Sequence, residues 1–414
     1  MNVLQINTAV NTGSTGRIAE NIGLAVISNG SKSTIAYGRE SRKSTSQTIQ
    51  IGTPLDYKLH GLKTRLFDKH GFGSTAATEK FIIEIKKLKP DIIHLHNLHG
   101  YYINVEILFN YLKTTNIPIV WTLHDCWPFT GNCSYFSFVK CDKWKTQCHH
   151  CPLNKRYPES FFIDNSFSNY NIKNGLFNGL KNMMLVTPSH WLRNLLKDSF
   201  LKNYPAQIIH NGVDLQKFMP VRIDQAAYRE KIGAADKNII LGVASVWDRR
   251  KGLADFKLLA ALLSLEDIIV LVGVSQEIMK DLPGNIIGIP RTENIDELAA
   301  LYNMATAFIN PTWVDNFPTT NIEALACGTP VITYRTGGSI EAIDEATGFV
   351  VEQGNIEGLI NAIKEIKLKG KIQYNKACRQ RAETFFKDED RFNDYYWLYE
   401  TMVQKESTKM VQAR

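Results

Sequence analysis

The sequence predicts an α/β protein with two doubly wound domains, and three observations lead to that prediction. The chain has 414 residues, roughly two to three times the ~150 residues of an ordinary domain. Hydrophobic residues make up 44% and charged residues 21%, which is typical of a globular protein with enough apolar side chain for two cores. Short β-branched runs alternate with segments of helical apolar spacing, which indicates parallel sheets covered by helices on both faces.

In the first half, six short runs rich in β-branched residues are expected to be strands. They are residues 2–7, 33–37, 91–96, 118–123, 184–188 and 207–210. Helices are expected where apolar residues recur at every third or fourth position, as at 17–28 and 79–89. Strands that are separated by helices pair in parallel, so these elements predict one doubly wound sheet.

The same pattern restarts after Phe218 and Pro220. Five further strand-like runs follow, at 238–245, 267–273, 285–290, 306–311 and 329–334. Helical spacing occurs between them at 253–265 and 295–305. We therefore expect a second doubly wound domain, joined to the first by a linker near 214–224.

The last segment has helical spacing and an unusual number of aromatic side chains. Residues 391–403 contain Phe392, Tyr395, Tyr396, Trp397 and Tyr399. A surface helix rarely carries so many, so we expect it to bury against something large. The predicted division is a first domain at 1–218, a second at 219–388, and a C-terminal helix at 389–414 that packs back on the first domain.

Composition excludes several classes of function. Lys and Arg number 48 against 41 Asp and Glu, a net charge of +7 that suits phosphorylated ligands or an anionic membrane surface. This excess is too small to indicate a dedicated nucleic-acid binder. Residues 1–17 contain no basic leader followed by an apolar core, and no run approaches ~18 apolar residues. We expect a cytoplasmic protein, and peripheral association with the inner face of the cell membrane stays open.

The densest functional signal lies between residues 313 and 343. Asp315 and Glu323 are separated by seven residues, and Pro318 suits the first turn of a helix that carries Glu323. The N-terminus of such a helix suits a diphosphate, whereas the carboxylates suit sugar and ribose hydroxyls. Taken alone, such a pair of acids is better explained by a cap and a solvated helix face. The adjoining ACGTPV run and the Gly337–Gly338 turn favour a ligand site.

Three adjacent cations stand in WDRRKGL at 247–253, namely Arg249, Arg250 and Lys251. Placing them together is costly unless they face an anion, and a diphosphate is the obvious one. A solvated surface turn is the alternative.

In the first half, glycines and polar residues also follow the expected strands. They are Gly13, Gly16 and Arg17 after the first strand, His96 and Asn97 after the third, and His124 and Asp125 after the fourth. Glycines let the backbone approach a ligand and open a helix at Arg17, and open α/β sheets bind ligands at the carboxyl ends of their strands. His94 and His96 share one strand face, where burial in the core is an equally good explanation.

These motifs resemble the family 4 retaining glycosyltransferases of the GT-B fold. That family carries two acids seven residues apart followed by EAxAxGxPV, and here the first acid is aspartate. The segments at 11–17, 122–125, 187–192 and 210–218 extend the resemblance over nearly the full length. DNFP, ACGTP and a cysteine-rich loop together resemble the subgroup similar to colanic acid and exopolysaccharide glycosyltransferases.

The resemblance implies two Rossmann-like domains that face an interdomain cleft. It further implies transfer of a hexose from a nucleotide diphosphate sugar to a saccharide or lipid-linked acceptor, with retention, in bacterial-type surface polysaccharide biosynthesis. The implied catalytic residues are His124, Asp315, Arg250 and Lys251; the donor-binding residues are Glu323, Asn316, Phe317, Pro318, Thr319, Gly13 and Gly16; the acceptor-side residues are Arg17, His96, Asn97 and Asp125.

Two departures from the family pattern qualify these roles. Val246 stands where the family has arginine, so the guanidinium role passes to Arg249 or Arg250, and we favour Arg250. No residue in the motifs is an obvious covalent nucleophile, so a retaining outcome fits front-face attack. In that mechanism the leaving phosphate accepts the proton of the acceptor hydroxyl.

Five of the seven cysteines fall between residues 126 and 151. Cys148 and Cys151 have the spacing of a zinc knuckle, and Cys133 with Cys141 can complete a four-thiolate site within a loop at 126–158. We favour a structural zinc over free or redox thiols. A catalytic metal is disfavoured because no HExxH or HxE…PCxxC pattern occurs, and we expect catalysis to need no metal.

Two other functions were weighed against the transferase. A GT-B-fold sugar-nucleotide epimerase or phosphorylase would share the phosphate-binding cations. A zinc-stapled nucleic-acid-binding protein is more remote, because aromatic platforms and extended basic stripes are missing. The donor base, the donor sugar, the acceptor, the linkage and the oligomeric state do not follow from the sequence.

Overall fold

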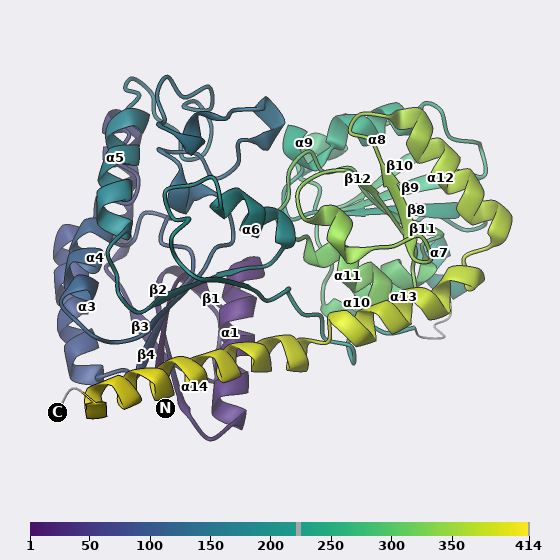
Figure 1. Ribbon diagram of the computed structural model, residues 1–414. Helices are drawn as coiled ribbons and strands as arrows, with labels where there is room; N and C mark the ends of the chain where they lie inside the picture. Colours follow the sequence, from purple (N-terminus) through teal and green to yellow (C-terminus); the bar gives the residue numbers. More distant parts are fainter. Residues whose placement is uncertain (221–224, 413–414) are drawn as a thin grey trace. The chain divides into compact units, whose positions relative to one another are not determined.

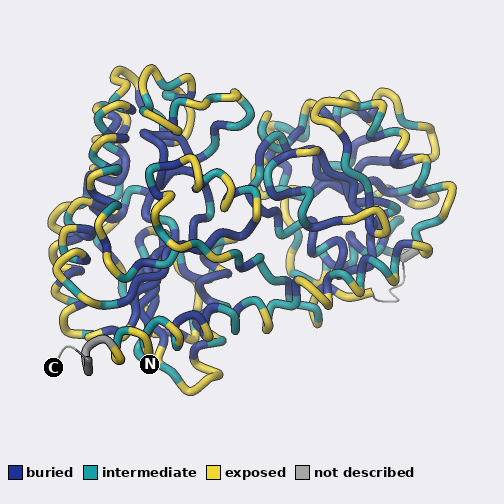
Figure 2. The backbone as a smooth tube through the Cα atoms, viewed as in Figure 1, coloured by how far each residue is buried: buried dark blue, intermediate teal, exposed yellow. Residues whose placement is uncertain are grey.

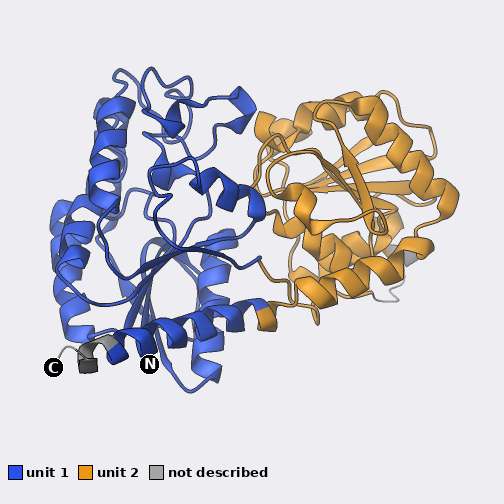
Figure 3. Ribbon diagram, in the orientation of Figure 1, with its two compact units in different colours: residues 1–210, 391–414 blue, residues 211–390 orange. Residues whose placement is uncertain are grey.

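The structure is a computed structural model that describes residues 1–220 and 225–412. It divides into two compact units, which Figure 3 colours separately: unit 1 comprises residues 1–210 and 391–414, and unit 2 comprises residues 211–390. The last four residues of the expected linker, 221–224, lie outside the described residues.

Unit 1 is built on one parallel sheet of seven strands in the order β3-β2-β1-β4-β5-β6-β7 (Figure 1). The strands are β1 (Asn2–Val10), β2 (Lys32–Ser41), β3 (Gln47–Gln50), β4 (Ile92–Leu95), β5 (Ile119–Thr122), β6 (Met183–Thr187) and β7 (Ala206–Ile208). Every residue of β4 and β5 is buried, as apolar strands covered on both faces should be. The six predicted strands are present, and the edge strand β3 was not predicted.

Six α-helices connect these strands. They are α1 (Gly13–Ser28), α2 (Pro54–Phe67), α3 (Thr75–Leu88), α4 (Val105–Lys113), α5 (Ser166–Phe177) and α6 (His190–Leu196). The helix expected to open at Arg17 begins at Gly13, so that prediction was wrong by one turn. Gly16 lies in the first turn, where an added Cβ would sit 3.3 Å from the backbone of Ala9 and of Asn11, so glycine lets α1 start close to β1.

The cysteine-rich loop between β5 and α5 contains only three short 3-10 turns. These are η1 (Trp127–Phe129), η2 (Ser137–Val139) and η3 (Lys143–Lys145). Trp127, Phe129 and Trp144 are buried in the core of unit 1, so aromatic side chains anchor the loop where regular secondary structure is missing.

Unit 2 holds a second parallel sheet, with six strands in the order β10-β9-β8-β11-β12-β13. The strands are β8 (Asn238–Val243), β9 (Asp267–Val272), β10 (Ile286–Ile289), β11 (Ala307–Asn310), β12 (Val331–Tyr334) and β13 (Gly348–Val351). The helices and turns are α7 (Gln225–Lys231), η4 (Arg249–Lys251), α8 (Leu253–Ala260), α9 (Gln276–Met279), α10 (Ile295–Met304), α11 (Thr319–Ala326), η5 (Ser339–Ala342), α12 (Ile356–Lys369) and α13 (Ile372–Phe385). The five predicted strands are present, and β13 was not predicted.

The long C-terminal helix α14 (Asp388–Gln412) belongs to unit 1 from Arg391 onward. Its Phe392, Tyr395 and Tyr399 form a core cluster with Ile18 and Ile22 of α1. Figure 1 shows α14 running beside α1 in unit 1. The prediction that the C-terminal helix packs back on the first domain is confirmed.

The apolar side chains concentrate at the sheets. Figure 2 shows the strands of each unit as buried and the outer helix faces and loop tips as exposed. Among residues 1–220 and 225–412, no helix combines the length and hydropathy needed to cross a bilayer.

Candidate active site

In unit 2, the predicted cations and acids follow two neighbouring strands. β8 and β11 pair directly, and the strand order reverses between them, because β9 and β10 lie beyond β8 whereas β12 and β13 lie beyond β11. Doubly wound sheets bind ligands outside the carboxyl ends of their strands at such a reversal. Arg250 and Lys251 follow β8 and Asp315 follows β11, so the two loops meet at this edge.

Lys251 and Asp315 form an ion pair between the two loops. Their side chains are 21% and 15% exposed, so the pair is sheltered and still accessible. The Arg250 side chain is 27% exposed, and its Nε lies 3.9 Å from the carboxylate of Asp248. Arg249 is exposed. The three adjacent cations therefore have different surroundings: Lys251 is held by an acid of the neighbouring loop, Arg250 lies beside Asp248 of its own loop, and Arg249 is exposed.

Backbone contacts fix the relative position of these loops. The N–H of Trp313 donates to the carbonyl of Arg250 at 2.8 Å, and the N–H of Gly338 donates to the carbonyl of Asp315 at 3.2 Å. Gly337 has a φ of +51°, and a Cβ there would lie 1.9 Å from the Asp315 carbonyl oxygen. The Gly337–Gly338 turn therefore requires glycine because it packs directly on the Asp315 backbone.

Glu323 lies on α11 and accepts a hydrogen bond from the hydroxyl of Tyr302 at 3.0 Å. Tyr302 is fully buried on α10, and burial together with the adjacent Glu323 raises its pKa well above the usual value. Tyr302 is therefore a permanent donor that orients the carboxylate. The sequence analysis did not identify it, because a tyrosine in an amphipathic helix has the pattern of an ordinary core residue.

The N-terminus of α11 differs slightly from the expectation. The helix begins at Thr319, and Pro318 stands just before it with ψ at 119° instead of occupying the first turn. Pro318 provides no side-chain cap for the first N–H groups. Asn316 and Phe317 are buried, and the ring of Phe317 packs on Phe386 with centroids 5.6 Å apart. The Phe317 side chain is thus a core side chain, and its carbonyl accepts from the amide of Asn211 at 3.1 Å.

A buried polar network holds α11 against the sheet. Asn321 accepts from the amide of Asn310 at 2.8 Å and donates to the carbonyl of Ser339 at 3.0 Å. The hydroxyls of Thr333 and Ser339 lie 2.6 Å apart. A satisfied network of this kind rigidifies its surroundings, so the helix that carries Glu323 keeps its place relative to β11 and β12.

In unit 1, the predicted acceptor-side residues follow β1, β4 and β5. The strand order again reverses between neighbours, here β1 and β4. The hydroxyl of Thr8 lies 3.1 Å from the carbonyl of Asn97 and 2.7 Å from that of His99, which ties the ends of the two strands together. Arg17 is exposed on α1.

A chain of hydrogen bonds connects His96 and His124. The Nε2 of Gln5 donates to the carbonyl of Ala19 at 2.9 Å, so its Oε1 accepts from His96 Nε2 at 3.0 Å. His96 Nδ1 lies 3.0 Å from His124 Nε2. Burial lowers the pKa of His96 well below the usual value and that of His124 to about 4, so both rings are neutral at pH 7.

These contacts determine where the protons lie. A neutral His96 that donates through Nε2 must accept through Nδ1, so His124 donates through its Nε2. The Nδ1 atom of His124 is then an acceptor.

Asp125 is engaged by its own unit. Its carboxylate lies 2.7 Å from His99 Nε2 and accepts the N–H of Trp127 at 2.9 Å. Burial alone would raise the pKa of Asp125, but the neighbouring His99 and the Trp127 N–H hold it below its usual value. Asp125 is 5% exposed, so its role in the structure is to fix the segment after β5.

The four cysteines of the predicted zinc site surround one small cavity. Cys133, Cys141, Cys148 and Cys151 all line a space of about 10 Å³ in the loop between β5 and α5. The N–H of Gly131 donates to Cys148 Sγ at 3.2 Å. No three of the four sulfurs lie within 4.8 Å of one another in the described part of the chain, so the thiols converge without forming a closed tetrahedral shell.

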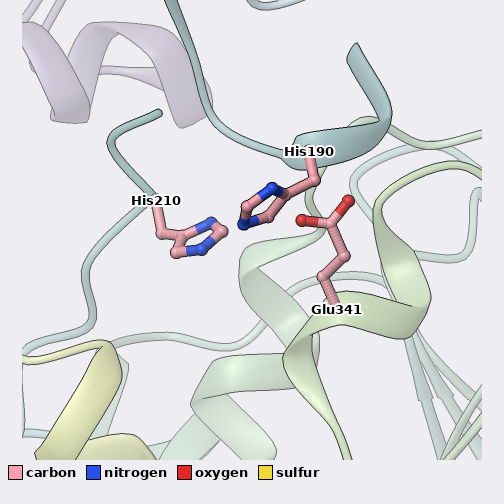
Figure 4. Close-up of side chains that lie close together, drawn as sticks. All are labelled: His190, His210 and Glu341. Atoms are coloured by element: carbon pink, nitrogen blue, oxygen red, sulfur yellow. The ribbon is translucent and has the colours of Figure 1, made fainter. Parts of the chain in front are cut away.

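Two further histidines lie in segments that carried the family resemblance. His190 begins α6, His210 ends unit 1, and their rings lie 5.9 Å apart at an angle of 50° (Figure 4). His210 Nδ1 donates to the carbonyl of Pro188 at 2.8 Å. The figure also labels Glu341, which lies on η5 of unit 2. The sequence analysis proposed none of these three as site residues.

Comparisons with known proteins agree across both units. Residues 35–217 match the family model described as Glycosyltransferase Family 4, and residues 224–385 match the model described as Glycosyl transferases group 1. A protein of Escherichia coli K12, provisionally named colanic acid biosynthesis glycosyl transferase WcaC, is 25% identical over 387 residues, which span 88% of this chain and 90% of that protein.

Solved structures share the fold over the whole chain. Sucrose-phosphate synthase of Thermosynechococcus elongatus superposes with a TM-score of 0.73 at 19% identity, covering 98% of this chain and 100% of that one. HepE of Anabaena, solved with UDP, gives a TM-score of 0.67 at 13% identity, covering 97% and 100%. These likenesses establish the fold.

Two parallel α/β units, a helix that returns to unit 1, and two family models that together span most of the sequence lead to one assignment. The chain belongs to the family 4 glycosyltransferases, the retaining hexosyltransferases of the GT-B fold.

Proposed function

We propose that the protein transfers a hexose from a nucleotide diphosphate sugar to a saccharide or lipid-linked acceptor in surface polysaccharide biosynthesis. The observation that carries the donor half of this proposal is the Lys251–Asp315 pair beside the oriented Glu323. The WcaC name, which refers to colanic acid biosynthesis, supports the polysaccharide role, and the UDP complex of HepE supports a nucleotide donor.

In this proposal, the polar groups of unit 2 bind the donor. Lys251 and Arg250 neutralise the diphosphate, which gains charge as it leaves. Asp315, oriented by Lys251, accepts hydrogen bonds from donor sugar hydroxyls, and Glu323, oriented by Tyr302, accepts those of the ribose. Thr319 and the preceding Asn316 supply backbone groups near the start of α11, where an anion is favoured.

Retention follows by front-face attack. The acceptor oxygen forms its bond to the anomeric carbon on the face that the diphosphate leaves, and the diphosphate departs with the electron pair of the broken bond. The proton of the acceptor hydroxyl passes to a phosphate oxygen, so no protein base is required. Family 4 enzymes are generally metal-independent, and we assign no metal to this step. Trapping a glycosyl adduct on a carboxylate would overturn it.

Unit 1 is proposed to bind the acceptor. His124, with Nδ1 as acceptor, orients a substrate hydroxyl, and Asn97 and Arg17 provide further polar contacts near the ends of β4 and β1. The ring of His96 and the carboxylate of Asp125 are hydrogen-bonded to other residues of unit 1, so these two residues act by positioning their neighbours. Gly13 and Gly16 allow the backbone at the start of α1 to approach a ligand. A lipid-linked acceptor would bring the protein to the inner face of the cell membrane.

A panel of sugar nucleotides tests the donor half. We expect one or two donors to raise the melting temperature of the wild-type protein, since a ligand that binds only the folded state stabilises it. Asp315→Asn and Glu323→Gln should remove that shift. Glu345→Gln, a change to an exposed acid of the same unit, is the control and should keep it. If both variants responded like the wild type, the assignment of the donor site would fail.

We also propose that Cys133, Cys141, Cys148 and Cys151 bind a structural zinc. Two N–H groups, those of Gly131 and Leu153, point at Cys148 and Cys151 and favour their thiolates, whereas burial acts in the opposite direction and raises the pKa of the Cys148 thiol to about 11. A Cβ at Gly131 would lie 2.8 Å from the Cβ of Cys148, so the glycine lets the two segments of the loop pack closely beside the cavity.

A buried cation near the cysteines supports the same proposal. Lys173 is 1% exposed, and its Nζ donates to the carbonyls of Trp127 and Thr130 at 2.9 and 3.1 Å. Among the described ion pairs, none involves Lys173. Burial lowers the pKa of Lys173 to about 7, and negative charge on Cys148 and Cys133 would oppose that shift. A four-thiolate zinc carries a net charge of −2 that would favour the ammonium form.

Metal analysis tests the zinc proposal. Purified wild-type protein should carry about one zinc per chain, and Cys148→Ser combined with Cys151→Ser should carry none. Cys126→Ala is the matched control, since Cys126 is buried in the same region and does not line the cavity. A wild-type protein that is free of metal and equally stable in chelator would refute the site.

A further inference from the structure

Helix α2 (Pro54–Phe67) exposes its apolar face. Leu55, Leu59 and Leu62 are 65%, 55% and 51% exposed, whereas the residues that the helix buries are His60, Gly61 and Thr64. An ordinary surface helix has the opposite arrangement, with leucines toward the core and polar residues toward water. The outward leucines therefore need an explanation other than packing within unit 1.

The three leucines form one stripe. Their spacings of four and three residues place them on the same side of a helix that turns about 100° per residue. Lys58 and Arg65 fall along one edge of the stripe. Lys63 falls along the other edge. An apolar stripe bordered by cations on both sides is the pattern of a helix that lies in the plane of a membrane surface.

The charges on α2 favour an anionic partner. Asp56 is the only acid of the helix, and its carboxylate accepts the N–H and the hydroxyl of Thr53 in the N-terminal capping box. Burial lowers the pKa of His60 to about 3, so this ring adds no charge. Lys58 and Arg65 are exposed beside the leucines, whereas the ammonium of Lys63 donates to the carbonyl of Phe72 at 2.9 Å.

A second exposed apolar segment is attached to the end of α2. The N–H of Phe161 donates to the carbonyl of Arg65 at 2.8 Å, and the amide of Asn165 donates to the carbonyl of Phe67 at 2.7 Å. These contacts hold the segment 161–167 against the helix. It carries an exposed phenylalanine group, which consists of Phe67, Phe161, Phe162 and Phe167 at 51%, 43%, 78% and 52% exposure.

The helix is firmly attached on its inner side. His60 Nε2 accepts the N–H groups of Gly71 and Gly73 at 3.2 and 3.1 Å, and His60 Nδ1 lies 3.0 Å from the hydroxyl of Ser74. A Cβ at Gly73 would lie 2.4 Å from the His60 ring, so the loop packs closely on the helix. The leucine stripe is therefore presented by an anchored element.

We propose that α2 and the segment 161–167 bind the surface of an anionic phospholipid bilayer. The leucine stripe and the phenylalanine group enter the boundary between headgroups and acyl chains, and Lys58 and Arg65 contact the headgroup phosphates. This surface belongs to the unit proposed to bind the acceptor, and its purpose, reaching a lipid-linked acceptor, rests on the proposed function.

Vesicle sedimentation tests the proposal with the full chain and without any sugar nucleotide. Wild-type protein should bind vesicles that contain about 30% phosphatidylglycerol in phosphatidylcholine, and bind pure phosphatidylcholine much less. Leu59→Glu combined with Leu62→Glu should weaken binding at least about tenfold, because two charges enter the apolar boundary. Leu265→Glu combined with Leu368→Glu is the matched control, since these leucines of unit 2 are 93% and 87% exposed.

A second variant tests the continuation of the surface. Phe162→Glu should weaken vesicle binding severalfold, since Phe162 is the most exposed residue of the phenylalanine group. Circular dichroism and the melting temperature should match the wild type for every variant, because only exposed side chains are changed.

Two results would overturn the proposal. One is binding to anionic vesicles that the α2 variants leave unchanged. The other is a wild-type dimer by light scattering that the Leu59 and Leu62 changes convert to a monomer, which would assign the surface to a second copy of the chain. Donor-induced thermal shifts are measured separately on the same variants, so failure of the lipid surface and failure of the transferase assignment can be told apart.

Discussion

At the scale of single residues, the contacts of Glu323 and His124 indicate which neighbours control the site. Tyr302 donates to Glu323, and Gln5 and His96 determine the tautomer of His124. All three neighbours are buried. Their influence is therefore expected in binding constants and in spectra, and less in overall stability.

Tyr302→Phe should weaken donor binding. The change removes the hydroxyl that donates to Glu323 at 3.0 Å, at a cost of about 1 kcal/mol or fivefold in KM. Tyr228→Phe is the control, because Tyr228 donates to Glu297 at 2.7 Å in the same unit and away from the site. Steady-state kinetics with the donor found by the panel measures both, and equal effects of the two changes would contradict the assigned role.

The protons of His96 and His124 can be observed directly. Nitrogen-15 spectra of histidine-labelled protein should show both rings neutral at pH 6 with the proton on Nε2, since burial lowers the pKa of His124 to about 4. Gln5→Leu removes the acceptor for His96 Nε2 and should mix the tautomers of both rings. Detection of His124 protonated at Nδ1 in the wild type would contradict the hydrogen-bond chain.

At the scale of elements, α14 supports the strands that lead into the site of unit 1. The hydroxyl of Tyr399 bonds to His94 Nδ1, and that of Tyr395 lies 3.3 Å from Thr122, whose hydroxyl is 2.8 Å from His94 Nε2. His94 and Thr122 lie on β4 and β5, directly before His96 and His124. The C-terminal helix thus contributes polar as well as apolar contacts to the core.

Tyr399→Phe should destabilise unit 1 by about 1–2 kcal/mol. The change leaves one nitrogen of the buried His94 without a partner, which costs more than the hydrogen bond itself. Trp397→Phe on the same helix should change stability by less than about 0.5 kcal/mol, since Trp397 is 55% exposed. Urea unfolding followed by circular dichroism measures both, and similar losses for the two variants would count against the α14 contacts.

The elements that the sequence predicted and those it missed differ in a physical way. The buried strands β4, β5 and β9 were predicted because they are continuous apolar runs. β3 was missed because Gln47–Gln50 is a mostly exposed and polar edge strand. α2 was not predicted. Its leucines Leu55, Leu59 and Leu62 are exposed, so the helical spacing of these residues marks a solvent-facing surface and not a core face.

The residues of the candidate site also divide into those that the sequence predicted and those that it missed. Spacing along the chain identified Asp315, Glu323 and Lys251, since these residues lie in contiguous motifs. The partners that orient them come from distant parts of the sequence: Tyr302 is 21 residues from Glu323, and Gln5 is 91 residues from His96. Only the folded sheet brings such pairs together, so a single sequence carries no signal for them.

At the scale of the whole molecule, the histidines are distributed unevenly. All ten lie between residues 60 and 210, and so within unit 1. Burial lowers the pKa of five of them, His60, His70, His94, His96 and His124. Unit 2 has no histidine, so the two units should respond differently to mild acid.

Unit 1 should lose stability selectively as the pH falls from 7 to 5. A histidine whose folded pKa is lowered stabilises the fold fully above its unfolded pKa of about 6.5, and this contribution is lost as the pH falls toward the folded value, about 4 for His124 and about 3 for His60. In that range, each such histidine lowers the free energy of unfolding of unit 1 by about 1.4 kcal/mol for each pH unit that the pH falls. Asp68 opposes the effect of one histidine, because burial raises its pKa to about 7 and its protonation stabilises unit 1.

In unit 2, the carboxylates whose pKa is lowered in the folded state, such as Asp267 and Asp214, lose their contribution only below about pH 4. Pulse proteolysis across a urea series, with mass spectrometry of the fragments, reports the unfolding of each unit at pH 7 and pH 5. We expect the free energy of unfolding of unit 1 to fall by several kcal/mol from pH 7 to pH 5, while that of unit 2 changes little. His94→Gln should reduce the slope for unit 1 by about one histidine, and parallel losses in both units would show that the buried histidines are not its source.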